Sequence, residues 1–325
     1  MKRIISITLA AIMALLCLAG CTQGDKGGNG NVLKIGIIQY MSHPSLDNCY
    51  NGIIAALEDS GLDYTVSKQV GSSNAADSDC VSFAKNMVAD NCDMIIAIAT
   101  PAAKAAFAAT DDTDIPVIFC AVSDPVAADL VKDMEAPGYP CTGTSDVLDL
   151  AAQVEMILKF QPDAKKIGVL YTSSEENSLT NLARFREVCG DKNIEVVASA
   201  VQNASDIPAA AEALASQVDC INNFTDNNVV NNLSVVLSAA EKYEIPVYGS
   251  EEEQVKNGCL ASVSIDYVAL GKVTGEQAVQ VLKGEDPAKM PVKTITDAEL
   301  VYNGEALSKL ELTLPEDYAQ AKNVK

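Results

Sequence analysis

The chain has 325 residues, and its formal net charge is −21, from 44 acidic against 23 basic side chains. A surface this acidic repels nucleic acids and anionic lipid headgroups, so neither is expected as a binding partner. The length favours two domains over one.

The first twenty residues have the layout of a secretory signal peptide. Lys2 and Arg3 precede an apolar stretch at 4–16, which small residues follow. A membrane-spanning helix, the alternative interpretation, needs about 20 apolar residues and is less well matched. We therefore expect residues 1–20 to be removed on export.

The motif at 18–21 (LAGC) resembles a bacterial lipobox. This resemblance implies that Cys21 becomes the first mature residue and carries a lipid; the alternative is an ordinary cleavage site with a chance cysteine. Residues 22–31 (TQGDKGGNGN) are polar and glycine-rich, which is typical of a flexible tether. We expect a protein anchored by lipid alone to the extracytoplasmic face of the cell membrane.

From residue 32 onward, short apolar segments alternate with amphipathic ones. Three continuous apolar runs have the pattern of strands buried on both faces of a parallel sheet, namely 32–40, 93–99 and 116–122. Helical patterns occur at 48–60, 77–89 and 101–109. This order predicts a doubly wound α/β sheet.

The same rhythm restarts in the second half of the chain. Three pairs of segments match in order, namely 34–40 with 166–172, 93–101 with 219–226, and 114–119 with 244–249. Matched spacing across three pairs predicts two similar α/β lobes. We expect the tail after residue 250 to cross back between them, making a hinge of several strands. The predicted boundaries are 32–146 plus 254–285 for lobe one and 147–253 plus 286–325 for lobe two.

Ten cysteines are present, but their spacing does not favour a disulfide framework or a zinc site. Apart from Cys17 and Cys21 they are scattered singly, several within apolar runs. We expect mostly free, buried thiols, and one or two disulfides stay an alternative because export leads to an oxidising compartment.

Ligands of open α/β sheets bind beyond the carboxyl ends of the strands, where helices begin. Hydroxyls and N–H groups there, as at Thr100 and Ser123, suit a carboxylate, while Asp226 or Glu251 could pair with an ammonium group. The alternative is that Thr100, Ser123, Asp124 and Asp226 simply cap helices. His43 is either a ligand contact or a turn residue.

Catalysis has little support in these residues. The chain has one histidine and lacks a GxSxG elbow, an HExxH helix and a phosphate-binding GxxxxGK[ST] loop. We expect no enzyme activity and no cofactor. An enzyme built on carboxylates is the remaining alternative, because acid pairs leave no local signature.

Several segments resemble the substrate-binding proteins of ABC transporters in the tryptophan/tyrosine-binding group. They are 39–47 (QYMSHPSLD), 96–103 (IAIATPAA), 114–128 (DIPVIFCAVSDPVAA), 142–145 (TGTS) and 258–271 (GCLASVSIDYVALG). The resemblance spans nearly all of the chain from residue 32 to about residue 314.

The resemblance implies a type I periplasmic-binding-protein fold, a monomer that closes on a free, often aromatic, amino acid and delivers it to an ABC permease with its ATPase. Carried over, it implies that Thr100, Ala121 and Ser123 hold the carboxylate. Asp226 comes first for the ammonium and Glu251 second. The other predicted contacts are Tyr40, His43, Leu46, Asp124, Tyr171 and Thr225.

Two other functions stay open at this point. One is binding of a different solute, such as an apolar acid or a nucleoside, which we expect to be distinguished by whether Asp226 faces the cleft. The other is a sensor domain that signals through a membrane partner.

Overall fold

The computed structural model describes residues 32–295 and 298–325. The predicted signal peptide, Cys21 and the tether lie outside the described residues. Within the described ranges, no helix has both the length and the apolar character needed to cross a membrane.

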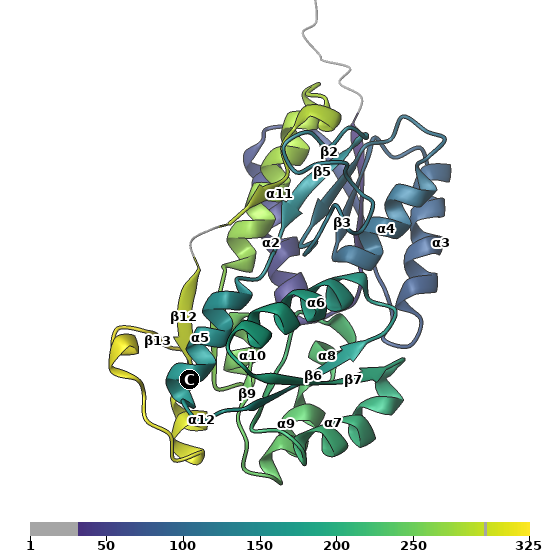
Figure 1. Cartoon of the computed structure of the whole chain (residues 1–325). Helices are drawn as coiled ribbons and strands as arrows, with labels where there is room; N and C mark the ends of the chain where they lie inside the picture. The colour runs from purple at the N-terminus through teal and green to yellow at the C-terminus, as the bar shows by residue number, and fades with distance from the viewer. Residues whose placement is uncertain (1–31, 296–297) are drawn as a thin grey trace, which may run out of the picture. The chain divides into compact units, whose positions relative to one another are not determined.

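Lobe one is built on a parallel sheet of six strands in the order β11-β5-β4-β3-β1-β2 (Figure 1). Its strands are β1 (Leu33–Gln39), β2 (Tyr64–Val70), β3 (Met94–Ile98), β4 (Val117–Cys120), β5 (Cys141–Ser145) and β11 (Lys293–Thr294). The helices α2 (Pro44–Asp59) and α11 (Tyr267–Leu282) pack together, as do α3 (Ala76–Ala89) and α4 (Thr100–Ala109). Full burial of β3 and β4 explains their continuous apolar sequences.

Lobe two has a parallel sheet of four strands in the order β7-β6-β8-β9. These are β6 (Lys166–Thr172), β7 (Glu195–Val201), β8 (Cys220–Asn222) and β9 (Val247–Tyr248). Around this sheet lie α5 (Leu150–Phe160), α6 (Glu176–Asp191), α7 (Ile207–Ala215), α8 (Asn227–Asn231), α9 (Leu233–Glu241) and α10 (Glu252–Lys256). A further sheet, β10-β12-β13, is formed by β10 (Ala261–Ser264), β12 (Glu299–Tyr302) and β13 (Lys322–Asn323), with α12 (Gly304–Lys309) following β12.

The predicted repeat is confirmed by the strand orders. Four strands of lobe one, β2-β1-β3-β4, have the same order as β7-β6-β8-β9 of lobe two. The matched sequence segments fall on β1 and β6, on β3 and β8, and on β4 and β9. Strands β2 and β7 were not predicted, because both are only partly buried and lack a continuous apolar run.

The chain passes between the lobes three times, after β5, after β10 and between β11 and β12. The predicted boundaries are wrong in the tail. Residues 254–264 belong to lobe two, because Leu260 and Ala261 share its core with Phe185 and Tyr248. Residues 286–294 belong to lobe one, because β11 pairs with β5.

Glycines hold α11 against α2 and thereby fix the start of α11 beside the first lobe. A Cβ atom on Gly271 would lie 2.1 Å from the Cys49 carbonyl oxygen, and one on Gly52 would lie 2.1 Å from the Val268 carbonyl oxygen. Because both clashes are with backbone atoms, a side chain at either position would force the helices apart.

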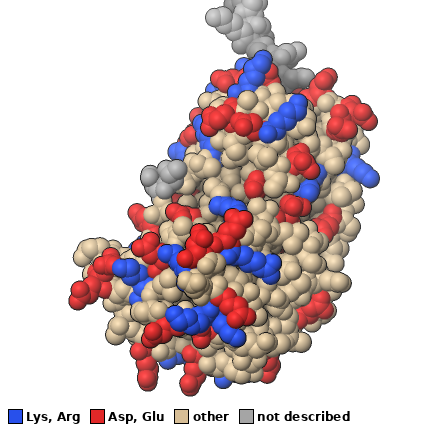
Figure 2. Space-filling view, viewed as in Figure 1, with Lys and Arg blue, Asp and Glu red and all other residues tan. Residues whose placement is uncertain are grey.

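The eight cysteines in the described part of the chain are all buried and unpaired. Each lies in the packed interior as a small apolar side chain. On the surface, acidic and basic side chains are interspersed over the face seen in Figure 2.

Candidate functional site

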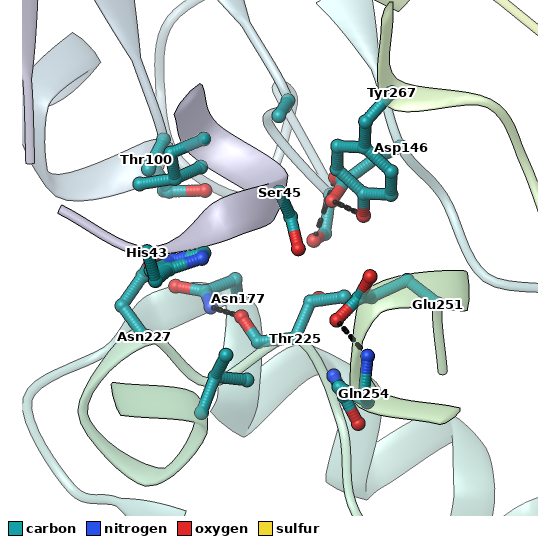
Figure 3. Close-up of a pocket in the computed structure, with 15 residues that line it drawn as sticks. His43, Ser45, Thr100, Asp146, Asn177, Thr225, Asn227, Glu251, Gln254 and Tyr267 are labelled. Carbon is teal, nitrogen blue, oxygen red and sulfur yellow. Dashed lines mark hydrogen bonds between the residues drawn. The ribbon is translucent and has the colours of Figure 1, made fainter. Parts of the chain in front are cut away.

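A pocket lies between the two lobes, at the carboxyl ends of the parallel strands (Figure 3). Both lobes and the hinge contribute to its lining, which consists of His43, Ser45, Leu46, Ala99, Thr100, Ala121, Ser123, Asp146, Asn177, Thr225, Asn227, Val230, Glu251, Gln254 and Tyr267. The position agrees with the rule that open α/β sheets bind ligands where their strands end and their helices begin.

Lobe one contributes the starts of two helices. His43 is the N-cap residue of α2, and Thr100 begins α4; Pro44 and Pro101 stand in the first turns, where a missing N–H costs nothing. The first N–H groups of a helix have no carbonyl partner within it. This wall therefore presents backbone donors to a bound anion.

Two alanines in this wall have strained backbones. Ala99 has φ 81° and ψ 153°, and Ala121 has φ 56°. Positive φ disfavours residues other than glycine, at a cost of about 1–3 kcal/mol each. Both residues directly follow a strand and line the pocket, so the strain is located where the backbone turns toward the ligand space.

An acidic end of the pocket is formed at the hinge. The Asp146 carboxylate accepts hydrogen bonds from Ser123 Oγ at 3.0 Å and from the Tyr267 hydroxyl at 2.8 Å. Asp146 follows β5 and Tyr267 begins α11, so this bond joins two of the three hinge crossings. Burial raises the pKa of Asp146.

Glu251 is the second carboxylate at this end (Figure 3). It is the N-cap residue of α10, where its oxygens accept from the backbone N–H groups of Glu253 at 2.6 Å and Gln254 at 2.9 Å. Its exposed fraction is 2%, and burial raises its pKa to about 7. A cation entering the pocket would meet two carboxylates without a basic partner of their own in the lining.

The opposite end of the pocket is neutral. The buried Glu175 carboxylate lies behind it and accepts from Asn227 Nδ2 at 2.6 Å and from Asn177 Nδ2 at 3.1 Å. Asn227 Oδ1 in turn lies 3.3 Å from His43 Nε2, a contact between the lobes. Burial lowers the pKa of His43 to about 4, so its imidazole is neutral at physiological pH. Burial and the neighbouring Asp226 raise the pKa of Glu175, whereas the N–H donors of Asn227 and Asn177 oppose this rise by stabilising the ionised form.

Several buried polar atoms of the lining have no hydrogen-bond partner among the described residues. These are His43 Nδ1, Ser45 Oγ, Thr100 Oγ1, Asn177 Oδ1 and Thr225 Oγ1. Since buried polar groups in proteins are nearly always paired, such a concentration in one pocket indicates a place where a polar ligand or water binds.

The family model described as "ABC transporter substrate binding protein" matches residues 34–325. The chain belongs to the ABC transporter substrate-binding proteins. Its fold is that of a type I periplasmic binding protein, as the prediction had it, with parallel α/β sheets in both lobes.

Three proteins similar to this substrate-binding protein bear on its ligand and on the arrangement of its lobes. A tyrosine-binding protein of Clostridioides difficile is 37% identical over 96% of this chain and 93% of its own length. The ABC domain in complex with L-Trp from Streptococcus pneumonia is 36% identical, with TM-score 0.84 over 90% of this chain and 98% of its own. The ligand-free, open structure of a Clostridium difficile substrate-binding protein with adhesive properties is also 36% identical, with TM-score 0.68 over 90% and 99%.

The two solved structures have the same sequence identity to this chain and cover the same share of it, but their TM-scores differ. The similarity is greater to the Trp complex than to the open, ligand-free form. The lobes of this substrate-binding protein are therefore arranged more like those of the ligand complex, which agrees with the hydrogen bond between His43 and Asn227 across the pocket.

Seven of the predicted site residues line the pocket. They are His43, Leu46, Thr100, Ala121, Ser123, Thr225 and Glu251. The other four predicted residues, Tyr40, Asp124, Tyr171 and Asp226, are not part of its lining.

Asp226 is the main correction. Its carboxylate accepts four hydrogen bonds within lobe two, from Thr172 N, Thr172 Oγ1, Ser178 Oγ and Val229 N. With its oxygens occupied in this way, it caps α8, holds the end of β6 and does not line the pocket. Asp226 does not line the pocket, so the criterion set for it does not support an amino acid over another solute. The carboxylates that reach the pocket are those of Asp146 and Glu251.

The other three residues have structural roles outside the pocket. The Tyr40 hydroxyl donates to Asp77 Oδ1 at 2.9 Å, and the Asp124 carboxylate accepts from the Ala127 N–H, as the capping alternative predicted. Tyr171 packs against the lobe-two core. Tyr40 and Tyr171 therefore do not line this pocket, and the aromatic rings in its lining are those of His43 and Tyr267.

Sequence reasoning missed Asp146, Tyr267 and Gln254. Asp146 follows β5, which is polar enough to give only a weak strand signal, and Tyr267 begins α11 directly after a hinge crossing. The sequence did contain one indication of Asp146, because this residue directly follows the TGTS segment that carries part of the family resemblance.

Proposed function

We propose that this substrate-binding protein is lipid-anchored outside the cell membrane, captures an aromatic amino acid in the interlobe pocket and delivers it to an ABC permease. It catalyses no reaction and acts as a monomer. The support is its family, the tyrosine named for one relative and the L-Trp bound to another, at 37% and 36% identity.

The observation that carries the proposal is the pairing of a buried acidic end with a wall of free backbone donors. Glu251 and Asp146 receive the α-ammonium group, because a cation there compensates two buried carboxylates. The first turn of α4, with the unpaired Thr100 hydroxyl, receives the α-carboxylate. A ligand lacking either charge would leave buried charge or donors unpaired.

The ligand side chain extends toward the neutral end, where Leu46 and Val230 supply apolar contacts and the neutral His43 imidazole supplies an aromatic face. Because polar contacts join the two lobes around the pocket, a ligand held from both sides favours the closed arrangement. The permease would then distinguish the loaded from the empty protein by the arrangement of the lobes.

The lipid anchor at Cys21 is a separate part of the proposal and rests on the sequence alone. Growth with a radiolabelled fatty acid should label the wild-type protein and not Cys21→Ala, which should be released from the membrane fraction. Equal membrane retention of the variant would contradict the anchor without touching ligand binding.

The test of ligand binding is a thermal-shift screen of the purified full chain against the twenty amino acids and common nucleosides, followed by calorimetry. A ligand that binds only the folded protein raises the melting temperature with the logarithm of its concentration over Kd. We expect shifts with Tyr, Trp or Phe and a simple one-to-one stoichiometry. A shift with nucleosides only, or with no amino acid, would overturn the proposal.

A further inference from the structure

The neutral end of the pocket consists of His43, Asn177, Asn227 and Thr225 (Figure 3). A residue outside the lining, Glu175, fixes which of their atoms can donate and which can accept a hydrogen bond. Glu175 has an exposed fraction of 1% and lies outside the pocket lining. All its hydrogen bonds come from N–H donors, at Asn177 Nδ2, Asn227 N, Asn227 Nδ2 and Asn228 N. Such a carboxylate orients every amide group that it contacts.

The orientation of the Asn227 amide determines which nitrogen of His43 carries the proton. Because Asn227 Nδ2 donates to Glu175, Asn227 Oδ1 is turned toward His43 Nε2, 3.3 Å away. An amide oxygen only accepts, so Nε2 must carry the imidazole proton. The imidazole is neutral, so His43 Nδ1 is then an acceptor, and it has no partner among the described residues.

Asn177 is oriented in the same way. Its Nδ2 donates to Glu175 Oε2 at 3.1 Å and to the Thr225 carbonyl oxygen at 3.2 Å. Both N–H groups are used, so Asn177 also offers its unpaired acceptor, Oδ1. The remaining unpaired atom at this end is Thr225 Oγ1, a hydroxyl that can donate or accept.

We infer that Glu175 is a positioning residue that makes this end of the pocket select an aromatic amino acid whose ring carries a hydrogen-bond donor. A phenol O–H or an indole N–H can donate to His43 Nδ1 or Asn177 Oδ1, and a phenol oxygen can also accept from Thr225 Oγ1. A plain phenyl ring leaves these buried acceptors unpaired and is disfavoured. This inference rests on the proposed function and adds the ligand's side-chain chemistry to it.

The first experiment needs no variant. Calorimetry of the purified full chain compares L-tyrosine and L-tryptophan with L-phenylalanine and 4-fluoro-L-phenylalanine, which is close to tyrosine in shape and lacks the donor. We expect tyrosine or tryptophan to bind at least about tenfold more tightly than either donor-free analogue. Equal binding of all four overturns the inference and leaves the proposed function intact. If no aromatic amino acid binds, both are overturned.

The second experiment tests Glu175 itself. In Glu175→Met the acceptor that holds Asn177 Nδ2 and Asn227 Nδ2 is removed, so either amide is free to turn and present a donor to the pocket. The ratio of Kd for phenylalanine to Kd for tyrosine should fall to below about threefold. The matched control is Asp226→Asn, an equally buried carboxylate whose partners Thr172, Ser178 and Val229 do not line the pocket. That control should keep the wild-type ratio. Retention of the ratio in Glu175→Met would overturn the role of Glu175, whereas a merely structural role would weaken both ligands equally.

Discussion

Asp226 and Glu251 are the same kind of group in two different settings. Each is a buried carboxylate in lobe two, each follows a parallel strand, and each caps a short helix. Asp226 accepts two hydrogen bonds from Thr172 and one from Ser178 in addition to its cap, whereas Glu251 accepts from two backbone N–H groups of its own helix. The number of donors that the fold brings to a carboxylate therefore decides whether it stabilises a lobe or stays available to a ligand.

The largest effect on stability is expected for Asp226→Ala. Removing the acceptor leaves four donors inside lobe two without a partner, so we expect the free energy of unfolding to fall by about 4 kcal/mol. Chemical denaturation monitored by circular dichroism measures this. The control is Asp149→Ala, an exposed N-cap with one bond to the Ala152 N–H, for which about 1 kcal/mol is expected. A loss of that smaller size in Asp226→Ala would show that its network is not structural.

Glu251 should instead contribute to the pH dependence of the unfolding free energy of the ligand-free protein. Its pKa is raised by burial from 4.5 to about 7, so the folded state binds this proton more tightly than the unfolded chain. The resulting stability is fully present below about pH 4.5 and is lost as the pH rises through 7. Relative to wild type, Glu251→Gln should gain on the order of 3 kcal/mol in unfolding free energy between pH 4.5 and pH 8. Urea titrations of both proteins at several pH values measure the difference, and parallel pH profiles would contradict it.

Asp226 is expected to matter for stability, whereas Glu251 is expected to matter for ligand affinity. Glu251→Gln removes a buried charge from the acidic end, so we expect amino-acid affinity to fall about 100-fold, or about 2.7 kcal/mol, in calorimetry at pH 8. Glu252→Gln on the same helix is the control, because Glu252 pairs with Lys256 and does not line the pocket. Wild-type affinity in Glu251→Gln would remove Glu251 from the site.

The smallest expected effect concerns the other wall of the pocket. Ala99 has φ 81° and ψ 153°, a conformation that glycine adopts without strain. Ala99→Gly should raise the free energy of unfolding by about 1 kcal/mol, and the same substitution at Ala103, inside α4, should lower it by about 1 kcal/mol. Thermal unfolding of the two variants measures both signs. Destabilisation by both would mean that the backbone at Ala99 is not strained.

Much of the fold followed from local patterns. The fully buried strands β3 and β4 were predicted because their sequences are continuously apolar, and the repeat was found because β1 and β6 carry nearly the same residues. The half-buried strands β2 and β7 were not predicted, since partial exposure leaves no comparable pattern. The tail was expected to cross between the lobes, but the residues at which it crosses were not predicted correctly.

By itself, the sequence determined the fully buried strands and the helices between them, that the two halves share one design, and that residues such as Thr100, Ser123 and Glu251 lie where strands end. Only the tertiary structure decided which carboxylates meet the ligand. The donors that occupy Asp226 come from Thr172 and Ser178, 54 and 48 positions away, and Asp146 meets Tyr267 across 121 positions. Local sequence records burial and backbone preference, whereas hydrogen-bond partners at such separations are chosen by how the sheets and hinge strands pack.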